Sequence, residues 1–148
     1  MLSMKQLQIQ TLDRHLAEVR LCEQPSKGWI AAIRQALGMN TRQVGARMGS
    51  TQQSAAQLEL NEANGSITLK SLRKAAEALD CRVAYVLIPN AGSLDAAIKK
   101  QARKKATALV TPVDQSMRLE AQEVGNLHEQ IEALAAELAK NPNSKLWD

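Results

Sequence analysis

The stretch GSTQQSAAQLE, at residues 49–59, decides how this sequence folds. Gly49 makes a tight break, and Thr51 is a good N-cap, because its hydroxyl can accept from a free backbone amide where a helix starts. Glutamines open that helix and recur one turn later on the same side: Gln52, Gln53 and Gln57. A glutamine amide presents a donor beside an acceptor and so matches adenine N6 and N7 in the major groove of DNA. Glutamine is also an ordinary surface residue, but the capped turn before this helix favours base recognition.

A second short helix precedes the break. Asn40 followed three residues later by Gln43 is a capping-box pattern, and it opens a helix that runs to Met48. Two short helices across a glycine turn predict a helix-turn-helix. Upstream, residues 29–37 carry apolar side chains at helical spacing, and Gly38 can take the left-handed backbone at a helix C-terminus. The first helix of a compact domain therefore begins here.

The same domain continues past the glutamine helix. Thr68 caps a further helix whose apolar residues point inward as far as Leu79, which completes a set of four. Residues 82–88 then break the helical period, since they are rich in β-branched and aromatic side chains, and Pro89 stops the run. We expect a mainly α domain over residues 28–90 that ends in one short β-strand.

A lone strand would leave unpaired amides and carbonyls along both edges. Because the sequence offers no good second strand, we expect the strands of two copies to pair as an antiparallel ribbon in a homodimer. The residues expected in that ribbon are Val83, Tyr85, Val86 and Leu87. Two alternatives stay open: the strand pairs with residues 1–7 of the same chain, or a coiled coil makes the dimer. The heptad-like stripe for such a coiled coil consists of Met117, Val124, Leu127, Ile131, Leu134 and Leu138.

Helical segments flank the domain. They are an N-terminal extension at residues 1–24, a C-terminal extension at residues 93–140 and a tail at residues 141–148. The helix that starts after Ser93 should end at about Leu109 or bend at Pro112. The lysine cluster Lys99–Lys105 could follow a DNA backbone or form a solvated face, and the sequence favours neither. The sequence also does not decide whether the Trp147 side chain packs against the rest of the protein or stays exposed in a free tail.

Composition excludes several classes of protein. The chain has 148 residues, 45% hydrophobic but only 2% aromatic, with 4 Pro and 7 Gly, which fits one helical domain with extensions and not a sheet of many strands. Residues 1–112 hold 16 Lys and Arg against 8 Asp and Glu, so a polyanion is the natural partner. Residues 113–148 hold 3 Lys and Arg against 7 Asp and Glu, and this acidic segment is better suited to bind a protein than a nucleic acid.

Catalytic and metal chemistry is not indicated. The two cysteines and two histidines are Cys22, Cys81, His15 and His128, and they lack the paired spacing of a zinc site. We expect no metal, no cofactor and no catalytic residue. The N-terminus lacks a signal-peptide core and the longest apolar run is too short to span a bilayer, so we expect a cytoplasmic protein.

Residues 42–59 resemble the helix-turn-helix of Xre/Cro-type regulators, and TQQS with QLE closely resembles a lambdoid-phage repressor recognition helix. This resemblance implies that the three glutamines face bases and that Arg34 and Glu59 form a shielded ion pair. A wider resemblance, to the "mobile mystery protein A" family, is carried by GWI at 28–30, ITLKSLR at 67–73, AEALDC at 76–81 and LWD at 146–148. Members of that family are Xre-type regulators encoded beside a Fic-domain protein, which implies an antitoxin-like or autoregulatory role.

Together these features predict a sequence-specific DNA-binding transcriptional regulator, a dimeric repressor and not an enzyme, that binds a double-stranded operator. Helix N-termini and the following loop come to the DNA backbone in this fold. The residues expected at phosphates are Thr51, Arg42, Asn61, Asn64 and Lys70. The alternative is a protein-binding antitoxin that neutralises the Fic-type partner directly. The Ser/Thr-containing string that many direct inhibitors of Fic enzymes carry is not found in this sequence.

Overall fold

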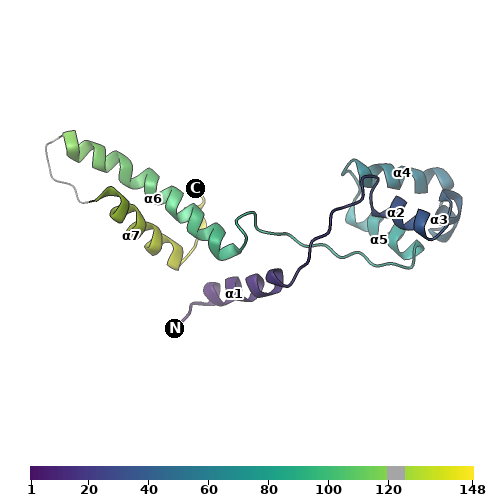
Figure 1. The fold of residues 1–148 in the computed structure, drawn as a ribbon, viewed down its shortest axis with the longest axis horizontal. Helices are drawn as coiled ribbons and strands as arrows, with labels where there is room; N and C mark the ends of the chain where they lie inside the picture. Colours follow the sequence, from purple (N-terminus) through teal and green to yellow (C-terminus); the bar gives the residue numbers. More distant parts are fainter. Residues whose placement is uncertain (120–125) are drawn as a thin grey trace. The chain divides into compact units, whose positions relative to one another are not determined.

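The computed structural model describes residues 1–119 and 126–148, which fold as helices joined by turns and extended segments (Figure 1). Two compact units are formed: one is Leu21–Tyr85, and the other combines Met1–Arg20 with Val86–Asp148. The elements of the described residues are α1 (Met4–Ala17), α2 (Trp29–Ala36), α3 (Thr41–Arg47), α4 (Gln52–Ala63), α5 (Leu69–Ala78), α6 (Leu94–Leu119), α7 (Leu127–Lys140) and the short 3-10 helix η1 (Ser144–Leu146). None of these helices is long and apolar enough to cross a membrane.

The unit Leu21–Tyr85 packs α2 to α5 around a small aliphatic core. The buried side chains of that core are Ile30, Val44, Met48, Ala55, Ala75, Ala78 and Leu79. Alanine supplies three of these seven residues, so the helices can approach closely without aromatic side chains between them. Each short helix also needs its free N-terminal amides satisfied, because few internal hydrogen bonds hold it.

Capping supplies those partners. Asn40 and Gln43 form the predicted capping box, with Asn40 Oδ1 accepting from the Gln43 amide and Gln43 Oε1 from the Asn40 amide, both at 2.9 Å. The Thr51 hydroxyl accepts from the Ser54 amide at 3.1 Å and starts α4, and Thr68 does the same for α5. Local sequence therefore fixes where three of the four helices begin.

The predicted β-strand at residues 82–88 is wrong. In the described chain this segment is an extended connector without a strand partner, and it carries the boundary between the two units, after Tyr85. A strand exists only where a neighbour completes its ladder of hydrogen bonds. The β-branched residues here find no such neighbour, and Val86, Leu87 and Ile88 stay exposed. The strand-paired ribbon through Val83, Tyr85, Val86 and Leu87 loses its basis with the strand itself.

The second unit joins the two ends of the chain. Its core consists of Ile98, Ala102, Ala106, Ala135 and Leu146, from α6, α7 and η1. Helices α6 and α7 lie side by side in opposite directions (Figure 1). The Asp13 carboxylate of α1 accepts from the backbone amides of Leu94, at 2.7 Å, and Asp95, at 3.1 Å. A negative charge there also complements the positive end of the α6 dipole.

Helices α6 and α7 differ from what the sequence predicted. Helix α6 does not end at Leu109 but continues through Pro112, with α7 packed along it; tertiary packing is what mainly stabilises helices in proteins. Ile131, Leu134 and Leu138 of the heptad-like stripe pack against the core of their own unit, which occupies the surface that a coiled coil would need. The side chain of Met117 and residue Val124 lie outside the described part.

At the end of the chain, the Leu146 side chain is buried in the core of this unit, whereas Trp147 is exposed.

Candidate nucleic-acid interface

Helices α3 and α4 form a helix-turn-helix whose tightness depends on Gly45. A Cβ at this buried position would lie 2.4 Å from the Thr51 carbonyl oxygen and 2.7 Å from its carbon. Those are backbone atoms of the turn, which cannot move aside as the end of a flexible side chain can. The turn itself passes through Gly49, whose φ of +66° is the left-handed conformation that glycine adopts freely. Both glycines therefore hold α4 at a fixed position against α3.

The side chains of Gln52, Gln53 and Gln57 are exposed on α4. Gln52 and Gln53 occupy the first turn and have no side-chain hydrogen bond among the described residues. Gln57 Nε2 donates to Asn61 Oδ1 at 2.9 Å, which orders both amides along one face of the helix. The amide oxygen of Gln57 has no hydrogen-bond donor among the residues that the structure describes. Helix α4 thus presents polar amides to the outside at its start and at its middle.

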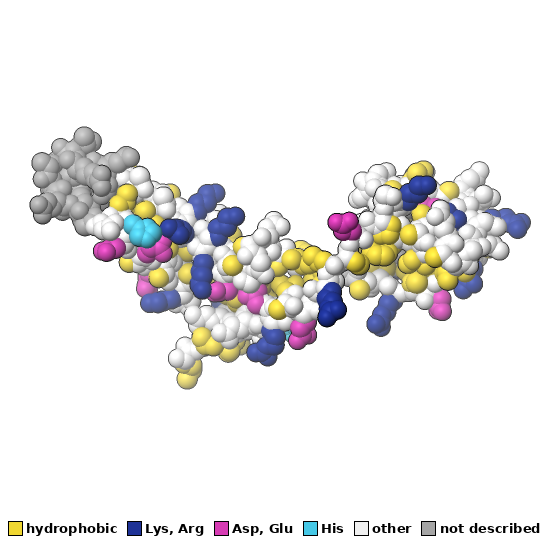
Figure 2. Space-filling model, in the orientation of Figure 1, with side chains coloured by type: hydrophobic (Ala, Val, Ile, Leu, Met, Phe, Trp, Pro, Cys, Tyr) yellow, Lys and Arg dark blue, Asp and Glu magenta, His cyan; other side chains and the backbone are white. Residues whose placement is uncertain are grey.

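Three of the five residues predicted at phosphates lie at the N-terminal ends of short helices, and the other two, Asn61 and Asn64, lie at the C-terminal end of α4. Arg42 is exposed in the first turn of α3, Thr51 caps α4, and Lys70 is exposed in the first turn of α5. Asn61 is half-buried and paired with Gln57, whereas Asn64 Oδ1 accepts from the Ser66 amide and hydroxyl and so shapes the loop. Figure 2 shows Lys and Arg side chains spread over the visible face of this unit and not gathered in one patch.

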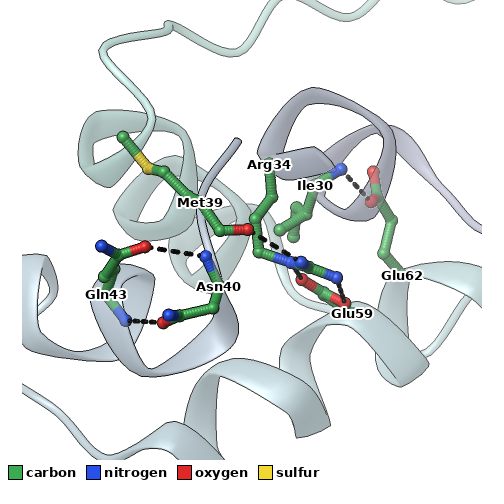
Figure 3. Close-up of polar contacts among 7 residues, drawn as sticks. All are labelled: Ile30, Arg34, Met39, Asn40, Gln43, Glu59 and Glu62. Atoms are coloured by element: carbon green, nitrogen blue, oxygen red, sulfur yellow. Dashed lines mark hydrogen bonds and ion pairs between the residues drawn. The ribbon is translucent and has the colours of Figure 1, made fainter. Parts of the chain in front are cut away.

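An ion pair connects the glutamine helix to α2 (Figure 3). Arg34 Nε donates to Glu59 Oε1 at 2.5 Å and Nη2 donates to Oε2 at 3.2 Å, a two-point geometry, while Nη1 donates to the Met39 carbonyl at 3.0 Å. Only 14% and 15% of the two side chains are exposed. The hydrogen bond to Glu59 raises the pKa of the Arg34 guanidinium, burial opposes that rise, and the charge of Glu59 adds to it. The structure therefore brings together the two residues that the phage-repressor resemblance pairs.

Glu62 is a structural residue that the sequence did not reveal. Its side chain is buried, and Oε1 accepts from the Ile30 amide at 2.8 Å at the start of α2 (Figure 3). The N-cap of α2 is Gly28, which has no side chain to do this and whose added Cβ would lie 2.5 Å from that same oxygen. Glycine at the N-cap of α2, which has no side chain to cap the helix, was the only signal, and it does not say which distant carboxylate takes that role.

The Lys99–Lys105 cluster belongs to the other unit and is largely engaged there. Lys99 Nζ lies 2.8 Å from Asp95 Oδ2, Arg103 Nη2 lies 3.0 Å from Glu132 Oε1, and Lys105 donates to the Lys145 carbonyl. The Arg103 and Lys105 contacts hold α6 against α7 and the chain end, whereas the Lys99–Asp95 pair lies within α6. Each exposed ion pair contributes only about 0–1 kcal/mol. These contacts favour a structural role for much of the cluster.

Comparison with known proteins identifies one region. Residues 30–86, less than half of the chain, match the family model described as helix-turn-helix. No curated protein and no solved structure matches the chain. The matched residues cover α2 to α5, with the capped turn and the exposed glutamines described above. Residues 30–86 are therefore a helix-turn-helix domain of the Xre/Cro type, the kind found in DNA-binding transcription regulators.

Proposed function

We propose that this protein is a sequence-specific transcriptional regulator in which α4 enters the major groove and Gln52, Gln53 and Gln57 read bases. The observation that carries the proposal is the combination of exposed amides with a fixed helix. The Arg34–Glu59 pair and the close contact at Gly45 hold α4 in place, so binding costs little ordering of the helix itself and mainly the ordering of its glutamine side chains. A glutamine amide pairs best with adenine N6 and N7.

Phosphate contacts position this helix. Charged and polar groups at the starts of α3, α4 and α5, together with two amides at the end of α4, would bind the DNA backbone and supply most of the affinity. The residues proposed for this role are Arg42, Thr51, Asn61, Asn64 and Lys70. Thr51, Arg42 and Lys70 are at helix N-termini, whose free amides and positive dipole ends attract phosphate. Asn61 and Asn64 are at the C-terminal end of α4 and would contribute through their side-chain amides alone.

We further propose that the protein binds as a homodimer. Helix α4 has 12 residues and is about 18 Å long at 1.5 Å per residue, so one copy reaches one major-groove segment. Two copies on one face of the duplex would place two such helices about 34–36 Å apart, one helical turn, on a near-palindromic site. The mass of the complex on a selected site, measured by light scattering, tests this stoichiometry.

Selection from a random pool of duplexes tests the function itself. The purified chain is incubated with the pool at moderate salt, and retained fragments are sequenced over several rounds. We expect an enriched motif with two related half-sites whose centres are about 10–10.5 base pairs apart. If retained DNA stays random in sequence while binding is strong, the protein is a non-specific binder and the proposal of base reading fails.

A second candidate function, a protein-binding antitoxin, is favoured by the helical unit. A groove of about 680 Å³ lies along α6 and α7, lined by alanines and by the cations Lys99, Lys100, Arg103 and Lys140. The carboxylates Asp95 and Glu132 line it too and pair with Lys99 and Arg103, so the net charge of the lining is positive. An acidic partner surface with apolar side chains would suit it. The partner that the family resemblance implies is a Fic-domain protein of the kind encoded beside members of that family.

Co-expression with a Fic-domain protein of that kind tests the second candidate. We expect the two to co-purify and the complex to weaken when Lys100 is replaced by Glu, whereas Lys70→Glu, in the helix-turn-helix, leaves it intact. Equal weakening by both substitutions would contradict a role for the groove.

A further inference from the structure

The helix-turn-helix unit contains a pocket of about 340 Å³ beside α2 and α5. Its walls are mostly apolar and come from Trp29, Ile33, Leu72, Ala76, Leu79 and Cys81. Glu62, from the last turn of α4, lines the pocket too, and so does Arg82 from the connector after α5. This volume is at the lower end of the range for small-molecule sites, about 300–1,000 Å³.

Glu62 gives this pocket its chemical character. The side chain is only 7% exposed, yet its Oε1 accepts a single hydrogen bond, from the Ile30 amide, and its Oε2 has no partner among the residues that the structure describes. A buried carboxylate is costly unless its charge and its lone pairs are matched. The amide and the dipole of α2 match one oxygen, and the other is available to a donor in the pocket.

We propose that this pocket binds a small ligand that carries one ammonium or amidinium group on an apolar body. Glu62 Oε2 accepts from the cation, and the aliphatic walls take the body out of water. The indole of Trp29, 41% exposed, supplies an aromatic surface that attracts cations and stacks on flat groups. Arg82 also lines the site, and its charge disfavours a second positive group on the ligand. Anionic ligands are disfavoured by Glu62 itself.

Phenethylamine, a cation at neutral pH, and its neutral analogue 2-phenylethanol are the probes. The full-length chain carries Trp147→Phe, which leaves Trp29 as the one tryptophan, and its fluorescence is followed during titration. We expect saturable binding of the amine and at least about tenfold weaker binding of the alcohol, since a hydrogen bond to a charged group contributes that much. Equal affinities, or no saturable binding of the amine, would overturn the proposal.

Three variants assign the charge that is responsible. Glu62→Gln keeps an acceptor for the Ile30 amide and should weaken the amine about tenfold or more. Arg82→Gln removes a like charge and should leave binding unchanged or tighter, and Glu77→Gln, an exposed carboxylate of α5, should change nothing. Unchanged binding in folded Glu62→Gln, or loss of binding in Arg82→Gln, contradicts the assignment.

A measurement without any change at Glu62 covers the case in which that variant fails to fold. In a Cys22→Ser chain, Cys81 is the remaining thiol and lines the pocket. We expect phenethylamine to slow alkylation of Cys81 by iodoacetamide, whereas 2-phenylethanol at the same concentration does not. Equal rates with both compounds would count against the site. Neither experiment requires DNA, so the outcome is independent of the proposed regulator function.

Discussion

At the scale of single residues, the Arg34–Glu59 pair is a shielded ion pair that joins α2 to α4 in the unit Leu21–Tyr85. Replacing one partner leaves the other shielded from water without a counter-charge, and we expect Arg34→Met or Glu59→Leu to lower the free energy of unfolding by about 3–5 kcal/mol. The double variant should lose clearly less than the sum. Urea unfolding followed by Trp29 fluorescence in a Trp147→Phe chain measures this, with the exposed Lys99→Met as control. Small and additive losses would contradict a shielded pair.

The same pair has a defined pH dependence. Because the pKa of Arg34 is raised above its usual value, the stabilisation that its charge gives is complete below that usual value and is lost only as pH rises through the raised one. We therefore expect no loss of stability from Arg34 between about pH 6 and pH 9. A drop over that range that disappears in Arg34→Met would contradict this.

Some of these residues could be predicted from the sequence and others could not. The exposed glutamines and the capping box are local patterns, and each leaves its signal within four residues. Arg34 and Glu59 are 25 positions apart and came from resemblance alone. Glu62 was missed, because a carboxylate that caps a distant helix differs in no local way from an ordinary charged residue near a helix end.

At the scale of elements, the angle between α3 and α4 depends on one missing methyl group. Alanine in place of a glycine inside a helix ordinarily stabilises it by about 0.5–1 kcal/mol. At Gly45 the added Cβ meets the turn backbone, so we expect Gly45→Ala to destabilise the domain by about 1–3 kcal/mol instead. Thermal unfolding measures the sign, and Ala46→Gly, an exposed neighbour, gives the ordinary propensity cost. A stabilised Gly45→Ala chain would contradict the close contact between position 45 and the Thr51 backbone.

The wrong strand at residues 82–88 belongs to this scale as well. β-branched residues favour an extended backbone, and the segment is extended, but a strand also requires a partner that sequence propensity does not supply. Helix α6 shows the opposite case, since Pro112 predicts an end or a bend and packing continues the helix past it. In both cases the tertiary neighbours outweigh local sequence propensity, because residues 82–88 lack a strand partner among the described residues and α7 packs along α6.

At the scale of the whole molecule, the helix-turn-helix unit, Leu21–Tyr85, falls in sequence between the two segments of the second unit, Met1–Arg20 and Val86–Asp148. The C-terminal Leu146 is buried against α6, and Gln101 Nε2 donates to its carbonyl at 2.8 Å. We expect Leu146→Ala to cost the second unit about 2–5 kcal/mol, as a core truncation does, and Trp147→Ala much less. Circular dichroism during thermal unfolding measures both, and unchanged DNA affinity in Leu146→Ala would agree with separate roles. An equal or larger loss in Trp147→Ala would contradict the anchoring by Leu146.

The central claim is that α4 reads bases, and a competition gel shift with glutamine variants on the selected site tests it most directly. We expect Gln52→Ala and Gln53→Ala to weaken the preferred site by about 1–3 kcal/mol while binding to random DNA stays the same. Arg42→Ala should weaken both kinds of DNA and reduce the salt dependence, and Gln35→Ala, an exposed glutamine of α2, should change neither. Full preference for the selected site in both Gln52→Ala and Gln53→Ala would contradict the account.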